Sequence, residues 1–139
     1  MRGDRGVATL KTRLAEAEAA LATLDEAVGR QPRSLIERDS AIFRLIYTFA
    51  VVSKACSRLL ADHERITAGS PTAAIRAARR LGWLPDEGAE AAMQACRDRD
   101  LAFQMYHTGI GDDIAERLAA HAALLRRWLE ALQRRAAEK

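Results

Sequence analysis

The feature that most constrains the fold is a run of apolar residues near the start of the chain, spaced alternately three and four positions apart. Its members are Val7, Leu10, Leu14, Ala17, Leu21, Leu24 and Val28. Residues at these spacings share one face of an α-helix. Gly29 and Pro32 follow in the usual order for a helix end. We therefore predict an amphipathic helix over residues 7–28 that packs on the protein through one face.

A second, longer helix is predicted to begin directly after this break. Ser34 can cap its amino end, and Glu37 stands at the position that completes a capping box. Apolar residues at helical spacing then continue to about His63, which makes this helix the spine of a bundle. Its inward face comprises Ile42, Leu45, Ile46, Phe49, Val52, Cys56, Leu59 and Leu60.

Two further helices are predicted in the middle of the chain. Ser70 can cap a short helix that continues to Leu81, with Pro71 at the first helical position, where its missing N–H costs nothing. Gly82 closes this helix. The next helix begins between residues 86 and 89 and continues to about residue 107.

The segment TGIGDD, residues 108–113, is interpreted as the break before the last helix, which Asp112 or Asp113 would cap. The apolar stripe of that helix contains Ile114, Leu118, His121, Leu125, Trp128 and Leu132. The sequence shows no strand alternation and no internal repeat. We predict an all-α fold, an antiparallel four-helix bundle with one additional short helix, in a single domain over residues 1–139.

The composition excludes several classes of function. A net charge of +3 can come from solvated helix faces, so it indicates nucleic acid only weakly. Cys56 and Cys96 lack a CxxC neighbour, and we expect them to be buried and reduced. Without a signal-peptide core or an apolar run of about 18 residues, the sequence predicts a cytoplasmic protein with no membrane partner. His63 and His121 are expected to be structural, and no zinc-like spacing or phosphate loop is present, so we predict no metal and no cofactor.

Residues 97–107, RDRDLAFQMYH, hold a dense group of charged and polar side chains. On a helix with about 100° per residue, Arg99 shares a face with Phe103 and Tyr106. That face extends back through Cys96 and Ala92. An arginine on an apolar face must pair with an acid, extend to solvent or reach a groove.

Two interpretations of this strip follow. In the first, Arg99 forms a structural ion pair with Asp98 or Asp100. In the second, the strip lines a polar cleft in which an arginine binds a phosphate and a histidine moves a proton. The side chains of that cleft would be Arg99, Asp100, Gln104 and His107.

Three stretches of the chain keep the order and spacing of a known family. They are RDSAIFRLIYTFAVVSK (38–54), SPTAAIRAARRLGWLPD (70–86) and DRDLAFQMYH (98–107). They resemble a helix with an RD start, a short helix that begins with SP, and the RNxxxHxY motif of the nucleotidyltransferase substrate-binding proteins, a branch of the HEPN superfamily. The resemblance covers about Arg38 to Arg134. It implies a helical bundle that dimerises, with the motif helices meeting at a groove.

Position by position, the resemblance to the motif is partial. Arg99 matches the motif arginine, and Tyr106 matches the motif tyrosine, which in related pairs a partner nucleotidyltransferase adenylylates. The asparagine position holds Asp100, and the histidine position holds Gln104, which cannot act as an acid or base near neutral pH. His107, three residues further on, is the histidine that could replace it.

The second helix departs from the family at three positions. Ile46 and Ala50 stand where the family usually has glutamates, and Ser53 stands where it has a tryptophan. Loss of two acids makes this surface more apolar, which favours a changed partner interface, or deeper burial, at these three residues over retained polar chemistry.

The resemblance implies two alternative functions, and a helical bundle with another interaction role is a third alternative. The first is a homodimeric accessory subunit that binds a small, separately encoded nucleotidyltransferase, as in toxin–antitoxin pairs, with little chemistry of its own. The second is a metal-free ribonuclease toxin that acts on RNA through Arg99 and His107. Asp100 would repel an RNA phosphate near Arg99, which counts against the second function.

Overall fold

The computed structural model describes residues 9–138, and this part of the chain is helical with no strand. Its α-helices are α1 (Leu10–Val28), α2 (Leu35–Glu64), α3 (Pro71–Arg80), α4 (Asp86–Leu101), α5 (Thr108–Glu116) and α6 (Leu118–Ala137). A short 3-10 helix, η2 (Ala102–Gln104), follows α4. The predicted all-α class is therefore confirmed for the described residues. Val7, the first residue of the predicted apolar seam, lies outside them.

Local capping explains where the helices begin and end. Ser34 Oγ accepts a hydrogen bond from Glu37 N at 3.1 Å, and the Glu37 carboxylate accepts one from Ser34 N at 2.8 Å. This confirms the predicted capping box of α2. Ser70 caps α3 through its side chain, with Pro71 in the first turn, as predicted. Gly82 follows α3 with a φ of 76°, a left-handed conformation that glycine adopts without strain.

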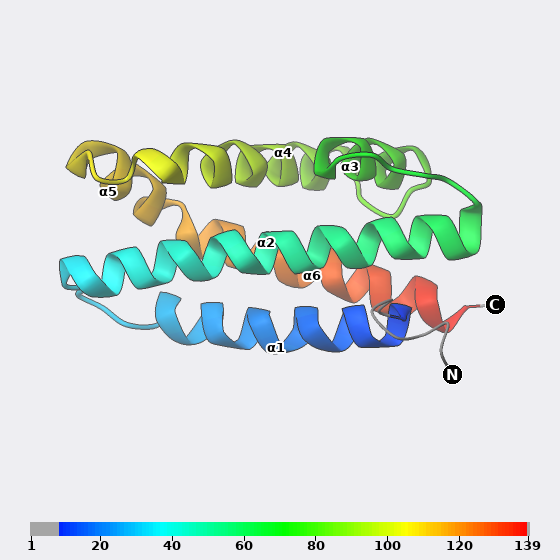
Figure 1. The fold of residues 1–139 in the computed structure, drawn as a ribbon, viewed down its shortest axis with the longest axis horizontal. Coiled ribbons are helices and arrows are strands. Elements are labelled where there is room, and N and C mark those ends of the chain that lie inside the picture. Colours follow the sequence, from blue (N-terminus) through cyan, green and yellow to red (C-terminus); the bar gives the residue numbers. More distant parts are fainter. Residues whose placement is uncertain (1–8, 139) are drawn as a thin grey trace.

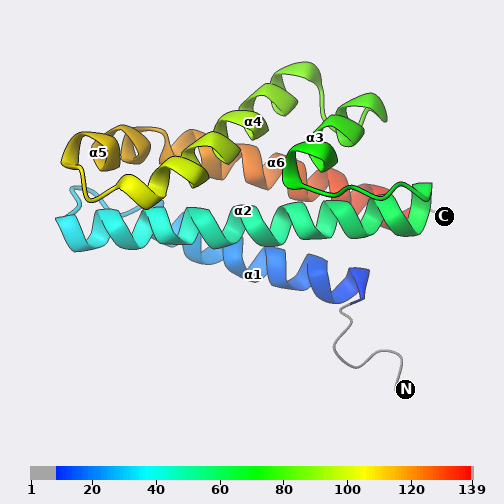
Figure 2. The ribbon, with the colours of Figure 1, turned by 45° about the horizontal axis from the view of Figure 1, so that its top comes forward.

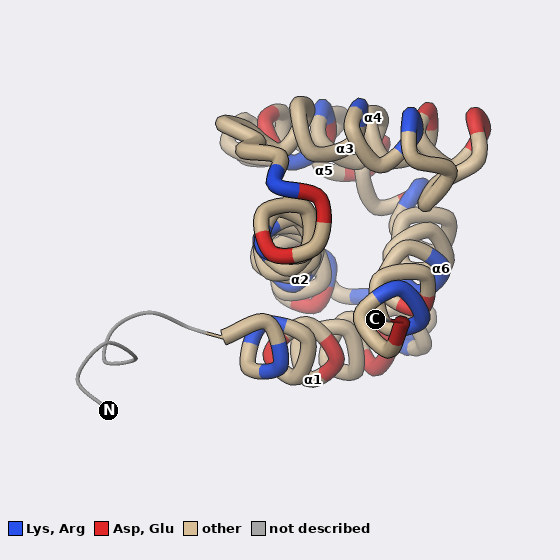
Figure 3. Tube along the Cα trace, turned by 90° about the vertical axis from the view of Figure 1, so that its right-hand side faces the viewer, with Lys and Arg blue, Asp and Glu red and all other residues tan. Residues whose placement is uncertain are grey.

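The long helix α2 organises the packing. Figure 1 shows α1 antiparallel to α2, and α6 packs against both. On the other side of α2 lie α3, α4 and α5, and α4 also contacts α6 (Figure 2). Figure 3, viewed along the long axis, places α2 and α6 between α1 and the layer of α3, α4 and α5. Because α2 contacts all the other α-helices of the described chain, its predicted role as the spine is confirmed.

The core runs along α2 and α6 and also includes buried residues of α1, α3 and α4. The rings of Phe49 and Trp128, both fully buried, pack edge to face with centroids 6.1 Å apart. The predicted inward residues of α2 are buried except for Ile46, which is half-buried. By length and composition α2 could also cross a membrane, which the sequence prediction did not foresee. Half of its apolar window is buried inside the protein, so packing against the other helices accounts for that apolar character.

Two boundaries predicted in the second half of the chain are wrong. Helix α4 ends at Leu101 rather than near residue 107, and residues 108–113 form most of α5 rather than a break. Neither Asp112 nor Asp113 caps the last helix, because both lie inside α5 and α6 begins at Leu118. The described chain therefore has one more short α-helix than the sequence predicts, together with the 3-10 helix η2.

A long-range contact explains this difference. The guanidinium of Arg38, on the first turns of α2, donates to the backbone oxygens of Met105 at 3.2 Å and Thr108 at 3.3 Å, which holds the chain in a turn after η2. Gly109 and Gly111 then lie within α5. A Cβ atom at Gly111 would collide with the Arg38 guanidinium. Glycine is needed there for close packing and does not mark a helix break.

Candidate functional site

Arg99, the motif arginine of the sequence analysis, lies in the last turn of α4 and is held by two neighbours. Its Nε and Nη2 atoms donate to Asp100 Oδ1 at 3.2 and 2.8 Å. Its guanidinium carbon lies 5.3 Å from the centroid of the Phe49 ring, within the range of a cation–π contact. Of the two predicted ion-pair partners, Asp100 pairs with Arg99, whereas Asp98 pairs elsewhere.

The other motif residues lie beyond the end of α4 and are exposed. Gln104 ends η2, and His107 immediately precedes α5. The Tyr106 ring is stacked at a tilt on the His107 ring, with 4.5 Å between centroids. Because the helix ends before them, Phe103 and Tyr106 do not continue the apolar face of Arg99. That prediction is wrong, since Phe103 is 77% exposed and Tyr106 is 76% exposed.

Asp98 is a buried carboxylate that the sequence analysis did not single out as a site. Arg117 donates to its two oxygens at 2.7 and 2.9 Å, and His121 Nε2 lies 2.6 Å from Oδ2. Burial alone would raise the pKa of Asp98, but the hydrogen bonds from Arg117 and His121 outweigh burial and lower it. The structural role predicted for His121 is thus confirmed. The helical spacing from Ala92 through Ala95 to Asp98 is a signal that could have indicated this burial.

Arg38 forms a second buried ionic cluster, at the end of the molecule where α2 begins. The residue is only 6% exposed, and its guanidinium pairs with Asp39 at 2.8 Å and Asp112 at 3.1 Å. Together with its two carbonyl contacts, these pairs fix the link between α4 and α5 against α2. The RD start of the stretch 38–54 was a sequence signal for this cluster. The sequence did not identify Asp112 on α5 as the second partner of Arg38.

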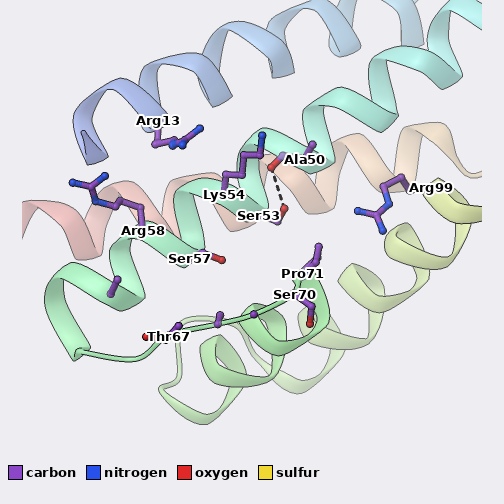
Figure 4. Close-up of a pocket in the computed structure, with 13 residues that line it drawn as sticks. Arg13, Ala50, Ser53, Lys54, Ser57, Arg58, Thr67, Ser70, Pro71 and Arg99 are labelled. Carbon is purple, nitrogen blue, oxygen red and sulfur yellow. Dashed lines mark hydrogen bonds between the residues drawn. The ribbon is translucent and has the colours of Figure 1, made fainter. Parts of the chain in front are cut away.

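A pocket of about 520 Å³ opens beside Arg99, between α1, α2 and the segment before α3 (Figure 4). Its lining residues are Arg13, Ala50, Ser53, Lys54, Ser57, Arg58, Ala61, Thr67, Ala68, Gly69, Ser70, Pro71 and Arg99. The described lining contains four cationic side chains and no acidic one. The pocket brings Arg99 together with two of the predicted partner residues, Ala50 and Ser53.

The three predicted partner residues are not equally accessible. Ile46 and Ala50 are half-buried on α2, and only Ala50 contributes to the pocket. Ser53 is 4% exposed, and its hydroxyl donates to the Ala50 carbonyl oxygen at 3.0 Å. A partner on the outer surface would therefore meet Ile46 and Ala50 before Ser53.

Within residues 9–138 no group of three or more histidine, cysteine and acidic side chains is placed to hold a metal ion. Cys56 and Cys96 are free and buried, as predicted. Burial raises the pKa of the Cys56 thiol to about 12, so this sulfur is protonated at neutral pH and is a poor metal ligand or nucleophile. Each acid of the motif and of the two buried clusters is instead paired with an arginine: Asp98 with Arg117, Asp100 with Arg99, and Asp39 and Asp112 with Arg38. His107 is exposed on the surface.

Comparison with known proteins places this arrangement in a family. Residues 12–134 match the family described as "Nucleotidyltransferase substrate binding protein like". The chain belongs to this family. It is also similar to a protein of known crystal structure from Thermus thermophilus, with 39% sequence identity and a TM-score of 0.81. That similarity covers 84% of this chain and 98% of the Thermus chain. No functionally curated protein matches the sequence. The family resemblance of the sequence analysis is confirmed.

Proposed function

We propose that this nucleotidyltransferase substrate-binding protein is a homodimeric accessory subunit of a small nucleotidyltransferase, in a toxin–antitoxin type of pair in the cytoplasm. The family supports a nucleotidyltransferase as the partner. We interpret the four long helices as the predicted antiparallel bundle, because α1 and α4 run opposite to α2 and α6 (Figure 1). In the middle of α2, Phe43 and Lys54 are exposed and accessible to a partner.

The observation that carries this proposal is the separation of the motif side chains. Arg99 is on α4 and already neutralised by Asp100. Gln104 and His107 follow the end of α4 in the chain, and both are exposed. Metal-free phosphodiester cleavage needs an acid or base within hydrogen-bond reach of the reacting oxygen, beside a charge that binds the phosphate. Arg99 is paired within α4, whereas Gln104 and His107 lie on segments beyond the end of that helix, and this arrangement favours binding over catalysis.

Exposed aromatic side chains offer the docking surface for the partner. Phe43 on α2 is 59% exposed and packs edge to face on Tyr47, with 5.6 Å between the ring centroids. Phe103 and Tyr106 are exposed on the segment that follows α4. Large aromatic residues supply much of the binding energy in protein interfaces, and their exposure in a single chain marks such surfaces. Ile46 lies three residues after Phe43 on α2 and extends this surface.

The test is complex formation with a small nucleotidyltransferase encoded in a neighbouring reading frame. Light scattering after size exclusion should give twice the monomer mass of 15.3 kDa for this chain alone and a larger complex with the partner. Phe43→Ser should weaken the complex at least about tenfold. Leu35→Ser, at a side chain that is 61% exposed on the first turn of α2, is the matched control and should leave affinity unchanged. Equal loss in both variants, or no complex, would contradict the proposal.

The ribonuclease alternative is tested without any partner. Wild-type protein and Arg99→Ala are incubated with a panel of RNAs in the presence of a metal chelator. Our proposal predicts no cleavage by either protein. Cleavage that Arg99→Ala and His107→Ala both abolish would show that the chain is a ribonuclease and would overturn the accessory role.

A further inference from the structure

The pocket beside Arg99 concentrates positive charge from three helices. Arg13 comes from α1, Lys54 and Arg58 come from α2, and Arg99 comes from α4 (Figure 4). Arg58 is paired with Asp62 at 3.0 Å and Arg99 with Asp100 at 2.8 Å. Arg13 and Lys54 have no ion-pair partner within residues 9–138. Two cations without local compensation at the mouth of a pocket make it attractive to an anion.

The start of α3 adds partial positive charge to the same pocket. Ser70 and Pro71 both line it, and α3 is ten residues long. Pro71 lacks an N–H, and the Ala73 N–H is bonded to the Ser70 hydroxyl, so the helix start contributes mainly the positive end of its dipole, which favours phosphate. Ser57 and Thr67 contribute hydroxyl groups to the lining. The cations and the helix end therefore supply the two kinds of group that proteins use to hold phosphates.

The rest of the lining is apolar and shallow. Ala50, Ala61, Ala68 and Pro71 present small apolar side chains. The guanidinium plane of Arg99 also offers a stacking surface for a flat ring. A volume of about 520 Å³ lies in the range of pockets that hold a single small ligand. A pocket lined by cations and small apolar side chains matches a molecule that joins a polyphosphate to an aromatic base.

We infer that this pocket binds a nucleoside polyphosphate, with its phosphates at Lys54, Arg13 and the start of α3 and its base toward Ala50 and Arg99. The inference extends the proposed function, because it assigns a ligand class to the proposed accessory subunit. Binding to the pocket is nevertheless a property of this chain alone. ATP binding can therefore be measured without the nucleotidyltransferase. A chain that does not bind ATP would overturn this inference but not the accessory role, and a chain that forms no complex would overturn the accessory role but not this inference.

The experiment is calorimetric titration of the full chain with ATP, inorganic triphosphate and adenosine, without a divalent cation. ATP should bind one site per chain, inorganic triphosphate more weakly, and adenosine most weakly. Lys54→Gln and Arg13→Gln should each weaken ATP binding about tenfold, the loss expected from one charge-assisted phosphate contact. Arg30→Gln is the matched control. It removes one exposed arginine at the opposite end of α1, outside this pocket, and should leave ATP affinity unchanged.

Circular dichroism of each variant should show intact helices. We expect this because Lys54 is exposed and Arg13 is half-buried on the first turns of α1. Absence of ATP binding would overturn the inference. So would an equal loss in Arg30→Gln, because it would indicate non-specific charge attraction. Equal affinity for ATP and inorganic triphosphate would overturn the nucleoside part. A short oligoribonucleotide that binds more tightly than ATP, and loses affinity in Lys54→Gln, would assign the pocket to RNA instead.

Discussion

Asp98 and Asp100 are two residues apart on α4, yet they belong to regions of opposite character. Asp98 is 1% exposed and accepts hydrogen bonds from Gln94, Arg117 and His121. The side chain of Asp100 is 66% exposed and pairs with its neighbour Arg99. A buried carboxylate is stable only when its partners replace the lost water, whereas an exposed ion pair contributes little to stability.

This difference divides the charged strip RDRDLAFQMYH into two parts. The part that faces α6 is a structural tie between α4 and α6, built around Asp98. The part from Arg99 onward faces solvent and the pocket, and its side chains can meet a ligand or a partner. The charged and polar side chains of the strip therefore divide into a buried group around Asp98 and an exposed group that begins at Arg99.

The largest effect is expected from Asp98→Asn. The substitution keeps the shape but removes the buried charge that pairs with Arg117 and accepts the hydrogen bond from His121. We expect a loss of about 3 kcal/mol in the free energy of unfolding, measured by urea denaturation followed by circular dichroism. Asp100→Asn is the matched control and should change it by less than about 0.5 kcal/mol, because that ion pair is exposed. Equal effects of the two substitutions would refute the comparison.

Gly111→Ala should have the next largest effect. Its new methyl group would collide with the Arg38 guanidinium and disturb a buried ionic cluster, so we expect a loss of about 2 kcal/mol in unfolding free energy. Gly109→Ala, two residues earlier in α5, meets open space and should stabilise the helix by up to about 1 kcal/mol. Opposite signs for these two substitutions would show that α5 is formed and that Arg38 fixes its position. Stabilisation by both would contradict the Arg38 contact.

The pH dependence of stability sharpens the contrast between the two aspartates. Because the folded pKa of Asp98 is lowered, its contribution is fully present above the unfolded value of about 3.9 and is lost as pH falls through the folded value. The difference in unfolding free energy between wild type and Asp98→Asn should therefore be constant near neutral pH and shrink on acidification. Urea midpoints of both proteins between about pH 7 and pH 2 test this. A difference that persists at the acid end would assign the effect of the substitution to packing.

Local chemistry made much of the fold predictable. Ser34 and Glu37 specify the start of α2, and Ser70 with Pro71 specifies the start of α3, because these residues satisfy backbone groups only a few positions away. The apolar spacing of α2 likewise identified the buried residues of the spine. These signals need no knowledge of the rest of the chain.

The region from Leu101 to Leu118 could not be predicted from the same signals. Its path depends on Arg38, which lies about seventy residues earlier and binds the Met105 and Thr108 carbonyl groups. Gly111 signals a break locally but serves a packing contact instead. The pocket could not be predicted either, because Arg13, Lys54 and Arg99 come from three separate helices. The sequence indicated Arg99 and Ala50 as site residues, but it gave no reason to place Arg13 beside them.

The smallest effect on stability is expected at Tyr106, an exposed residue of the proposed docking surface. Its side chain is 76% exposed, so Tyr106→Phe should change the unfolding free energy by less than about 0.5 kcal/mol. If the partner nucleotidyltransferase adenylylates this hydroxyl, incubation with the partner and ATP should add one AMP group to wild type and none to Tyr106→Phe, as read by mass spectrometry. Tyr47→Phe is the matched control. Tyr47 is half-buried on α2 with its hydroxyl bonded to Thr23, so its removal should leave the modification intact. An AMP group that survives in Tyr106→Phe would show that the exposed strip is not the modified region and would confine its role to docking.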